Sequence, residues 1–291
     1  MSPTRRTVLA GLAAGALTAC AAPGPSGTPA APAASPSPPA ASPSPSVSPS
    51  LSVTPTARPR GRDEVVAGYA GAVPSEWGLD VTGVLRRLPG GQGVALTFDA
   101  CGGPGGSGYD RELVGTLRRY AVPATLFVNS RWAEANPAVL RELAADPLFE
   151  LGNHGTAHRP LSVTGRAAYG IDGTRDVGGV YDEVMANHLA LAALRGRPPR
   201  FFRSGTAHYD EVAVRIVAEL DEQVAGFTVN ADGGATFTAA QVRRAIGEVR
   251  PGDVVIGHFN QPGHGTAAGL AAALPGLLDQ GRKFVHLSKG E

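Results

Sequence analysis

The chain has 291 residues, of which 43% are hydrophobic and 18% charged, and its formal net charge is +1. Two cysteines exclude a disulfide-rich scaffold, and no apolar run after the first 20 residues reaches the roughly 18 residues that a membrane-spanning helix needs. Residues 63–291 contain 21 basic and 25 acidic residues, which excludes nucleic-acid binding through phosphate neutralisation.

Residues 1–20 have the pattern of a signal peptide. Arg5 and Arg6 give a positively charged start that resembles a twin-arginine signal, and a short run of mostly apolar and small residues follows. Residues 17–20, Leu-Thr-Ala-Cys, resemble a bacterial lipobox in which the cysteine is lipidated. We expect an exported lipoprotein that is anchored to the membrane through Cys20 and faces the cell wall. The alternative is a plain signal peptide and a secreted protein.

Residues 21–62 are rich in Pro, Ala and Ser and hold 12 of the 25 prolines but no acidic residue. A segment of this composition cannot bury enough apolar surface to offset the entropy of ordering, so we expect a disordered linker. All 25 acidic residues lie within 63–291, which we expect to be a single catalytic domain.

From residue 93 onward, short β-branched runs alternate with amphipathic stretches. The expected strands are 93–98, 124–129, 149–152, 200–203, 224–229, 253–258 and 283–287. The expected helices are 110–120, 137–145, 177–194, 211–220, 239–249 and 267–278, the last kinked or split at Pro275. Strands separated by helices predict a parallel α/β sheet or barrel, and active sites in such folds lie at the carboxyl ends of the strands.

Residues capable of chemistry stand at the ends of five expected strands: Asp99, His154, Arg203, Asp232 and His258. Each alone has an ordinary explanation, such as a turn aspartate, a surface ion pair or a buried histidine. A carboxylate, a guanidinium and an imidazole at one edge of a sheet together predict an active site.

His154 and His158 form a candidate metal site, because two imidazoles four residues apart in a turn can converge on one ion. Asp99 is a candidate general base or metal ligand. His258 suits a general acid, since imidazole titrates near neutral pH. Asp232 could orient that histidine, and Arg203 could pair with a catalytic carboxylate and keep it ionised.

The order of these residues resembles the five motifs of the polysaccharide deacetylases with a NodB-homology domain, carbohydrate esterase family 4. The motifs are Thr97-Phe98-Asp99, His154 with His158, Phe202-Arg203, Asn230-Ala231-Asp232 and Ile256-Gly257-His258. The resemblance spans about residues 93–287. It implies a distorted (β/α) barrel, a divalent metal, usually zinc, and hydrolysis of acetyl groups on a sugar.

Residue by residue, the resemblance implies that Asp99 is the general base and that Arg203 positions it. It implies that His154 and His158 bind the metal. Asp232 matches the carboxylate that tunes the general acid, and His258 matches the acid itself.

The sequence departs from the family pattern where a second aspartate usually binds the metal, because that position is Ala100. Asp99 itself, Cys101 as a thiolate, or His208 could supply the third ligand. Cys101 could instead be a small buried filler. Gly155 also stands where the family usually has Ser or Thr.

We therefore expect a monomeric, metal-dependent hydrolase that removes acetyl groups from N-acetylated sugars of an envelope polysaccharide such as peptidoglycan. Ala100 motivates one alternative, a catalytically impaired carbohydrate-binding protein of the same fold. A metal amidase acting on a non-sugar acyl group is another. The stretch 161–176 is expected to form a rim loop beside the site.

Overall fold

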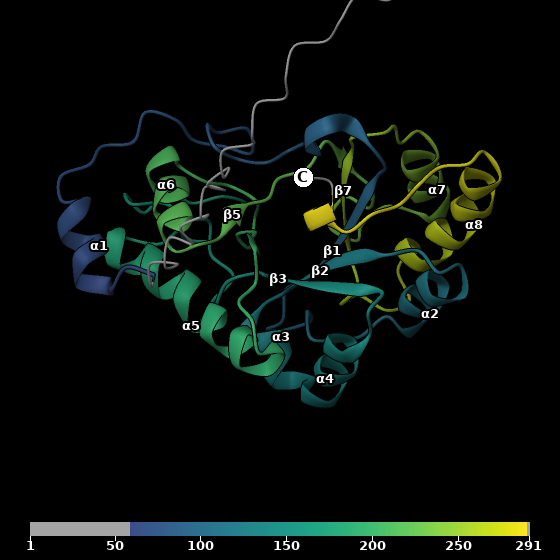
Figure 1. Cartoon of the computed structure of the whole chain (residues 1–291), viewed down its shortest axis with the longest axis horizontal. Coiled ribbons are helices and arrows are strands. Elements are labelled where there is room, and N and C mark those ends of the chain that lie inside the picture. The colour runs from purple at the N-terminus through teal and green to yellow at the C-terminus, as the bar shows by residue number, and fades with distance from the viewer. Residues whose placement is uncertain (1–58, 290–291) are drawn as a thin grey trace, which may run out of the picture. The chain divides into compact units, whose positions relative to one another are not determined.

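A computed structural model describes residues 59–289, and in them seven parallel strands form a curled sheet (Figure 1). The strands are β1 (Ala95–Ala100), β2 (Ala124–Val128), β3 (Phe149–Asn153), β4 (Phe201–Phe202), β5 (Gln223–Val224), β6 (Val229–Asn230) and β7 (Val254–His258). Their order across the sheet is β5-β4-β3-β2-β1-β7-β6. The expected distorted (β/α) barrel is confirmed. The predicted signal peptide, Cys20 and the linker up to residue 58 lie outside the described residues.

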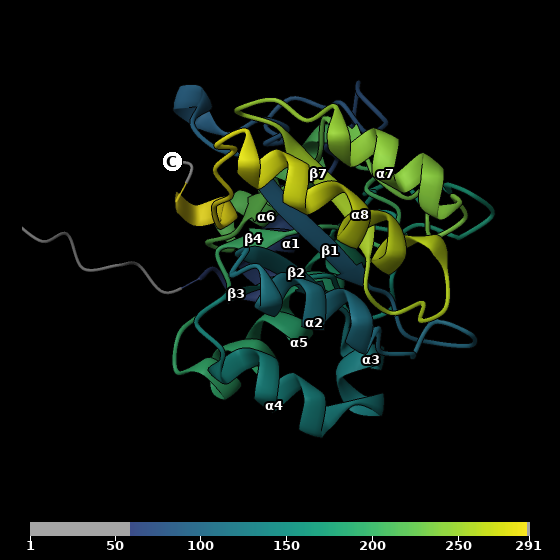
Figure 2. The same cartoon turned by 90° about the vertical axis from the view of Figure 1, so that its right-hand side faces the viewer.

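Helices cover the outer side of the sheet, where α7 packs against α8 and α8 against α2 (Figures 1 and 2). They are α1 (Arg62–Gly68), α2 (Arg111–Arg119), α3 (Ser130–Ala135), α4 (Pro137–Ala145), α5 (Val177–Arg195), α6 (Glu211–Glu219), α7 (Ala239–Gly247) and α8 (Gly265–Asp279). Side chains of Asp110, Asp176, Asp210 and Thr238 accept the N–H three residues ahead and so fix where four of them begin. No helix within residues 59–289 is long and apolar enough to cross a membrane.

Strand β1 shows how the sheet sorts its side chains. Leu96, Phe98 and Ala100 are buried in the apolar cluster formed with the outer helices. Thr97 and Asp99, the residues between them, bond instead to a side chain inside the barrel. Successive side chains of a strand point to opposite faces, so the odd-numbered positions of β1 line the interior.

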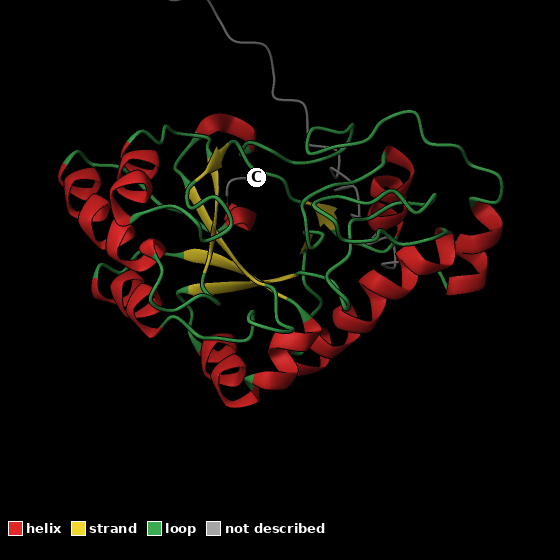
Figure 3. Ribbon diagram, turned by 180° about the vertical axis from the view of Figure 1, so that it is seen from behind, coloured by secondary structure: helices red, strands yellow, loops and turns green. Residues whose placement is uncertain are grey.

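The expected strand 224–229 is two strands, and this correction explains how the sheet curls. β5 and β6 lie at opposite edges of the sheet, yet only residues 225–228 separate them. Five residue steps span at most about 18 Å, so the two edges must approach each other. Leu85 pairs with the chain that crosses between them: its N–H donates to the Val224 carbonyl at 2.8 Å, and its own carbonyl accepts from the Gly226 N–H at 2.8 Å. The curl of the strands is visible in Figure 3.

Three other elements differ from expectation. Residues 283–287 are not a strand: Phe284 forms one isolated bridge with Val94, and a 3₁₀ turn follows at Leu287–Lys289. Helix α3 was not expected, and it starts where the Asn129 side chain accepts the Arg131 N–H. Helix α8 is not split at Pro275 but runs through it.

Glu222 is a buried acid in the core between β3 and α5. Its Oε1 accepts hydrogen bonds from Asn153 Nδ2 at 2.8 Å and from His188 Nδ1 at 2.7 Å. Burial raises the pKa of Glu222 to about 7, and the two hydrogen bonds oppose this rise. The folded protein therefore holds a proton that the unfolded chain releases near its ordinary pKa of 4.5.

We expect the Glu222→Gln variant to lose less stability than the wild type as the pH rises from about 5 to about 8. A raised carboxyl pKa contributes stability below the unfolded value, and this contribution disappears as the pH passes the folded value. Thermal unfolding across this range checks it, with the exposed Glu248→Gln as the control. Parallel stability curves for wild type and Glu222→Gln would contradict the assignment.

Candidate active site

The five strand-end residues meet at the carboxyl edge of the barrel. Asp99 is the fifth residue of β1 and pairs in register with His258, the last residue of β7. His154 directly follows β3, Arg203 directly follows β4, and Asp232 lies two residues beyond β6. The structure thus brings together residues that are spread over most of the domain sequence.

Arg203 is fully buried and joins opposite parts of the barrel. Its Nη1 donates to Asp99 Oδ1 and to Thr97 Oγ1, both at 2.8 Å. Its Nε and Nη2 donate to the carbonyls of Ala225 and Gly226 at 3.1 and 3.0 Å. Every part of the guanidinium fork is engaged, so Arg203 is an internal brace and not a surface ion pair.

Asp99 is held as a buried carboxylate with one oxygen left for chemistry. Burial raises its pKa, but the charge of Arg203 and the neighbouring His154 and His258 outweigh burial, so the pKa is lowered overall. Oδ1 is occupied by Arg203, and Oδ2 lies 3.7 Å from His154 Nε2. An ionised, fixed carboxylate oxygen of this kind can accept a proton.

His154 and His158 present their Nε2 atoms to the same space. The His154 ring donates from Nδ1 to the Arg203 carbonyl at 2.8 Å, which leaves Nε2 with its lone pair. The two rings lie 5.0 Å apart and almost perpendicular. His158 has a φ of 62°, an uncommon value for a residue with a side chain, and its buried Nε2 has no hydrogen-bond partner.

The backbone around these histidines is held by a side chain that the sequence did not reveal. Glu183 on α5 accepts the N–H groups of Ala157, at 2.9 Å, and of Arg159, at 3.2 Å. Gly155 has a φ of 76°, and a Cβ there would lie 2.4 Å from Glu183 Oε1. The glycine that replaces the family's usual Ser or Thr is thus required by the position of Glu183.

Asn129 was also missed, although its place at the end of an expected strand was a usable signal. Its Nδ2 donates to the carbonyls of His154 and Gly155 at 2.9 and 2.8 Å. Together, Asn129 and Glu183 fix the loop that carries both histidines from two sides.

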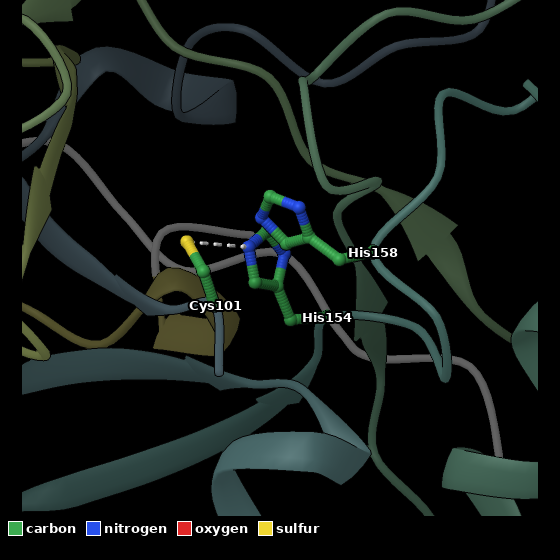
Figure 4. A group of neighbouring side chains, drawn as sticks. All are labelled: Cys101, His154 and His158. Carbon is green, nitrogen blue, oxygen red and sulfur yellow. Dashed lines mark hydrogen bonds between the residues drawn. The ribbon is translucent and has the colours of Figure 1, made fainter. Parts of the chain in front are cut away.

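Cys101 stands next to the two histidines (Figure 4). Its Sγ lies 3.8 Å from His154 Nε2, and the donor atoms of Cys101, His154 and His158 all lie within 4.8 Å of one another. Burial raises the pKa of the Cys101 thiol, but the neighbouring imidazoles of His154, His158 and His258 lower it far below its usual range. Imidazole nitrogen and thiolate sulfur are donors that bind zinc and related ions, so these residues fit a divalent metal.

The other two candidates for the third ligand are placed differently. Asp99 is not part of the cluster of Cys101, His154 and His158. His208 donates from Nδ1 to the Thr206 carbonyl at 2.8 Å, and its ring lies between Trp77 and Tyr169 on the rim.

His258 and Asp232 form a second pair, in which Asp232 is buried and His258 is partly exposed. His258 Nδ1 donates to Asp232 Oδ1 at 3.0 Å, and Asp232 Oδ2 accepts the His258 N–H at 2.7 Å and the Thr266 hydroxyl at 3.0 Å. Burial lowers the pKa of His258, but Asp232 and Cys101 raise it well above its ordinary value. The imidazole is therefore fixed with Nδ1 occupied and Nε2 available.

A cavity of about 370 Å³ opens between these groups. Asp99 and His258 line its floor, and its walls come from the rim loop and from residues after β4 and β6. The lining residues include Tyr169, Ile171, Thr206, Phe227, Asn230 and Gly233. The floor thus combines a fixed base and a fixed acid beside a cluster able to bind a metal, which suits metal-assisted hydrolysis.

A family model described as polysaccharide deacetylase matches residues 87–225, which include Asp99, His154, His158 and Arg203. The domain belongs to the polysaccharide deacetylase family. The sequence-based assignment to this family is thereby confirmed. Asp232 and His258 lie beyond the matched residues of this deacetylase domain, and their place in the site rests on the structure.

The deacetylase domain is similar to two relatives, and the share of the relative's length that it covers differs between them. It is 27% identical over 213 residues to the chitooligosaccharide deacetylase of Sinorhizobium fredii, covering 68% of this chain and 93% of that protein. It is 23% identical over 179 residues to the uncharacterized protein YlxY of Bacillus subtilis, covering 60% of this chain. The chain spans 51%, about half, of the length of YlxY.

Solved structures share the fold of the deacetylase domain. The Bc1960 peptidoglycan N-acetylglucosamine deacetylase matches with a TM-score of 0.59 and 23% identity, covering 71% of this chain and 92% of that one. A family 4 pseudoenzyme from Bacillus anthracis matches with a TM-score of 0.59 and 20% identity, and the match covers 70% of this chain and 67% of that one. Because one neighbour is an enzyme and the other a pseudoenzyme, the fold alone does not decide activity.

We expect Arg203→Met to destabilise the deacetylase domain by about 3–5 kcal/mol, because it leaves the buried Asp99 carboxylate without its partner. The matched control is Arg244→Met, which removes an arginine from an exposed ion pair with Glu248 and should cost less than about 0.5 kcal/mol. Urea denaturation of both variants measures the difference. Similar losses in the two variants would show that Arg203 is not an internal brace.

Proposed function

We propose that the protein is a metal-dependent hydrolase that removes acetyl groups from N-acetylated sugars of an envelope polysaccharide. The observation that carries the proposal is the presence of two ion pairs, Asp99 with Arg203 and His258 with Asp232, on adjacent strands at the floor of one cavity. Amide hydrolysis needs both a base for the attacking water and an acid for the leaving amine.

The base half of the chemistry belongs to Asp99. Arg203 occupies Oδ1 and keeps the carboxylate ionised, so Oδ2 is the atom that takes a proton from the attacking water. A divalent ion held by His154 and His158 supplies Lewis-acid polarisation of the acetyl carbonyl when it is bound.

The acid half belongs to His258. Asp232 occupies Nδ1 and stabilises the imidazolium, so the Nε2–H is the proton that His258 can give to the departing sugar amine. The Thr266 hydroxyl and the His258 N–H hold Asp232 in place, which fixes the direction of the imidazole ring. One water is consumed as the amide C–N bond breaks, and the products are acetate and the free amino sugar.

The envelope is the proposed location of the substrate. The support is the export signal predicted for residues 1–20 with Cys20 as the lipid anchor, together with the names of two similar proteins, a chitooligosaccharide deacetylase and a peptidoglycan N-acetylglucosamine deacetylase. A membrane-anchored enzyme on the outer face would meet peptidoglycan as its nearest N-acetylated polysaccharide.

We expect Asp99→Asn to lower the rate of acetate release by about 10²–10⁴-fold, since an amide keeps the shape of the carboxylate but does not act as a base. Acetate is measured after incubation with N-acetylglucosamine oligosaccharides and with peptidoglycan, with and without a chelator. Asp146→Asn is the control, because Asp146 precedes β3 at the opposite edge of the barrel. Glycan binding without any acetate from the wild type would favour the carbohydrate-binding alternative, and release from acylated peptides alone would favour the amidase.

A further inference from the structure

Ala100 stands where the family pattern has a carboxylate, but its side chain does not face the cluster of Cys101, His154 and His158. Ala100 is fully buried in the apolar cluster under the outer helices. The alternation of β1 places Asp99 and the residue two ahead, Cys101, on the interior side. Gly102 then turns the chain with a φ of 67°, and a Cβ there would lie 2.4 Å from the Trp132 backbone nitrogen. Strand and turn together direct Cys101 toward the histidines.

The distances in the cluster are close to those of a bound ion. Bonds of about 2.3 Å to sulfur and about 2.0–2.1 Å to imidazole nitrogen put two tetrahedral ligand atoms about 3.5 Å apart. Cys101 Sγ and His154 Nε2 are 3.8 Å apart, so this pair needs a shift of only a few tenths of an ångström, and the ligand atoms of all three residues lie within 4.8 Å of one another. The buried Nε2 of His158 has no hydrogen-bond partner, and coordination of the ion would give its lone pair a partner.

We propose that Cys101 is the third protein ligand of the metal, so that this deacetylase site is Cys-His-His. The thiolate at position 101 then takes the role that the family resemblance gives to a carboxylate at position 100. Asp99 remains outside the coordination shell, with Oδ2 free for proton transfer. A soft sulfur ligand shifts the preference of the site toward zinc and cobalt and away from magnesium and manganese.

The test loads the 291-residue chain with Co²⁺ and with Zn²⁺ in turn. A sulfur-to-cobalt charge-transfer band in the near ultraviolet is expected at one equivalent of Co²⁺, and X-ray absorption of the zinc form is expected to show one sulfur at about 2.3 Å. Both readouts concern the bound metal and not turnover. Missing acetate release with the band present would therefore refute the proposed function and leave this proposal standing.

Variants separate the three candidate ligands. Cys101→Ala should lose the band and bind the metal weakly, whereas Cys101→Asp should recover binding without the band and bind Mn²⁺ better than the wild type. Asp99→Asn and His208→Ala should keep the band. A band that persists in Cys101→Ala, or a wild type that binds one metal ion without any sulfur signal or binds no metal at all, would overturn the assignment.

A second, independent observation concerns the rim loop between Pro160 and Asp176. Its base is fixed by buried hydrogen bonds: the Ser162 N–H donates to Thr174 Oγ1 at 2.8 Å, and that hydroxyl donates to the Ser162 carbonyl at 2.6 Å. Its tip is a two-residue hairpin turn in which Ala168 and Ile171 exchange backbone hydrogen bonds of 3.1 and 2.9 Å.

The tip presents an aromatic ring to the cavity. Tyr169 has a φ of 53°, an uncommon value for a residue with a side chain. The residue is 77% exposed. It lines the same cavity as Asp99 and His258. Its ring stands 5.0 Å from the His208 ring, which in turn lies 5.9 Å from Trp77.

We propose, resting on the function above, that Tyr169 is a binding residue that stacks on a sugar ring next to the one being deacetylated. A rigid, exposed aromatic face at the mouth of a polar site suits the apolar face of a pyranose. The anchored base of the loop fixes its backbone, and the contact with the His208 ring orients the side chain of Tyr169, which lowers the entropy cost of stacking.

Titration calorimetry with an N-acetylglucosamine tetrasaccharide tests this in the Asp99→Asn background, where turnover does not interfere. Adding Tyr169→Ala should weaken binding by about 2–10-fold, the range that an aromatic contact of 0.5–1.5 kcal/mol gives. Tyr169→Phe should bind as the background does. Leu189→Ala, which removes another exposed apolar side chain from α5, is the control.

Unchanged affinity in Tyr169→Ala, equal weakening by Tyr169→Phe, or no tetrasaccharide binding in the background would overturn the stacking proposal. Acetate release from the wild type is scored separately. A glycan that binds through Tyr169 without being deacetylated would refute the proposed function alone.

Discussion

The buried guanidinium of Arg203 is the interaction on which the rest of the site depends. It sits at the carboxyl edge of the barrel and bonds to β1 through Asp99 and to the crossing between β5 and β6 through two carbonyls. Its own carbonyl also accepts the Nδ1–H of His154. One residue therefore sets the charge of Asp99, the tautomer of His154 and the closure of the sheet. A lysine could not do this, because its single ammonium lacks the planar fork.

The charged residues of the site form two separate ion pairs. Arg203 pairs with Asp99 on one side, and Asp232 pairs with His258 on the other. Asp99, Arg203 and Asp232 are buried and the His258 side chain is 17% exposed, so removing one partner of a pair would leave an uncompensated charge in the site. A base kept ionised and an imidazole kept charged can coexist on neighbouring strands because each has its own counter-ion. Environments that push two titratable groups in opposite directions are what acid–base catalysis requires.

The carboxyl-edge residues could be predicted because polar side chains at the ends of parallel strands converge. The division of residues 224–229 between two strands could not be predicted, because a short β-branched run does not reveal that its two halves pair with different strands. Glu183 was invisible because its partners are backbone N–H groups, which carry no sequence signal. The orientation of Cys101 follows from the alternation that starts at Asp99, but the turn that secures it depends on Trp132, far along the chain.

The segment around Leu85 runs along a seam of the curled sheet between the end of β5 and the start of β7. Leu85 bonds to the main chain of residues 224–226, and Arg87 bridges to Asp253 at the start of β7. A shorter chain beginning at β1 would leave this seam with unpaired N–H and C=O groups, which are a template for sheet extension between molecules. The residues ahead of the first strand therefore protect the edge of the sheet against edge-to-edge aggregation, a role unrelated to the chemistry inside the barrel.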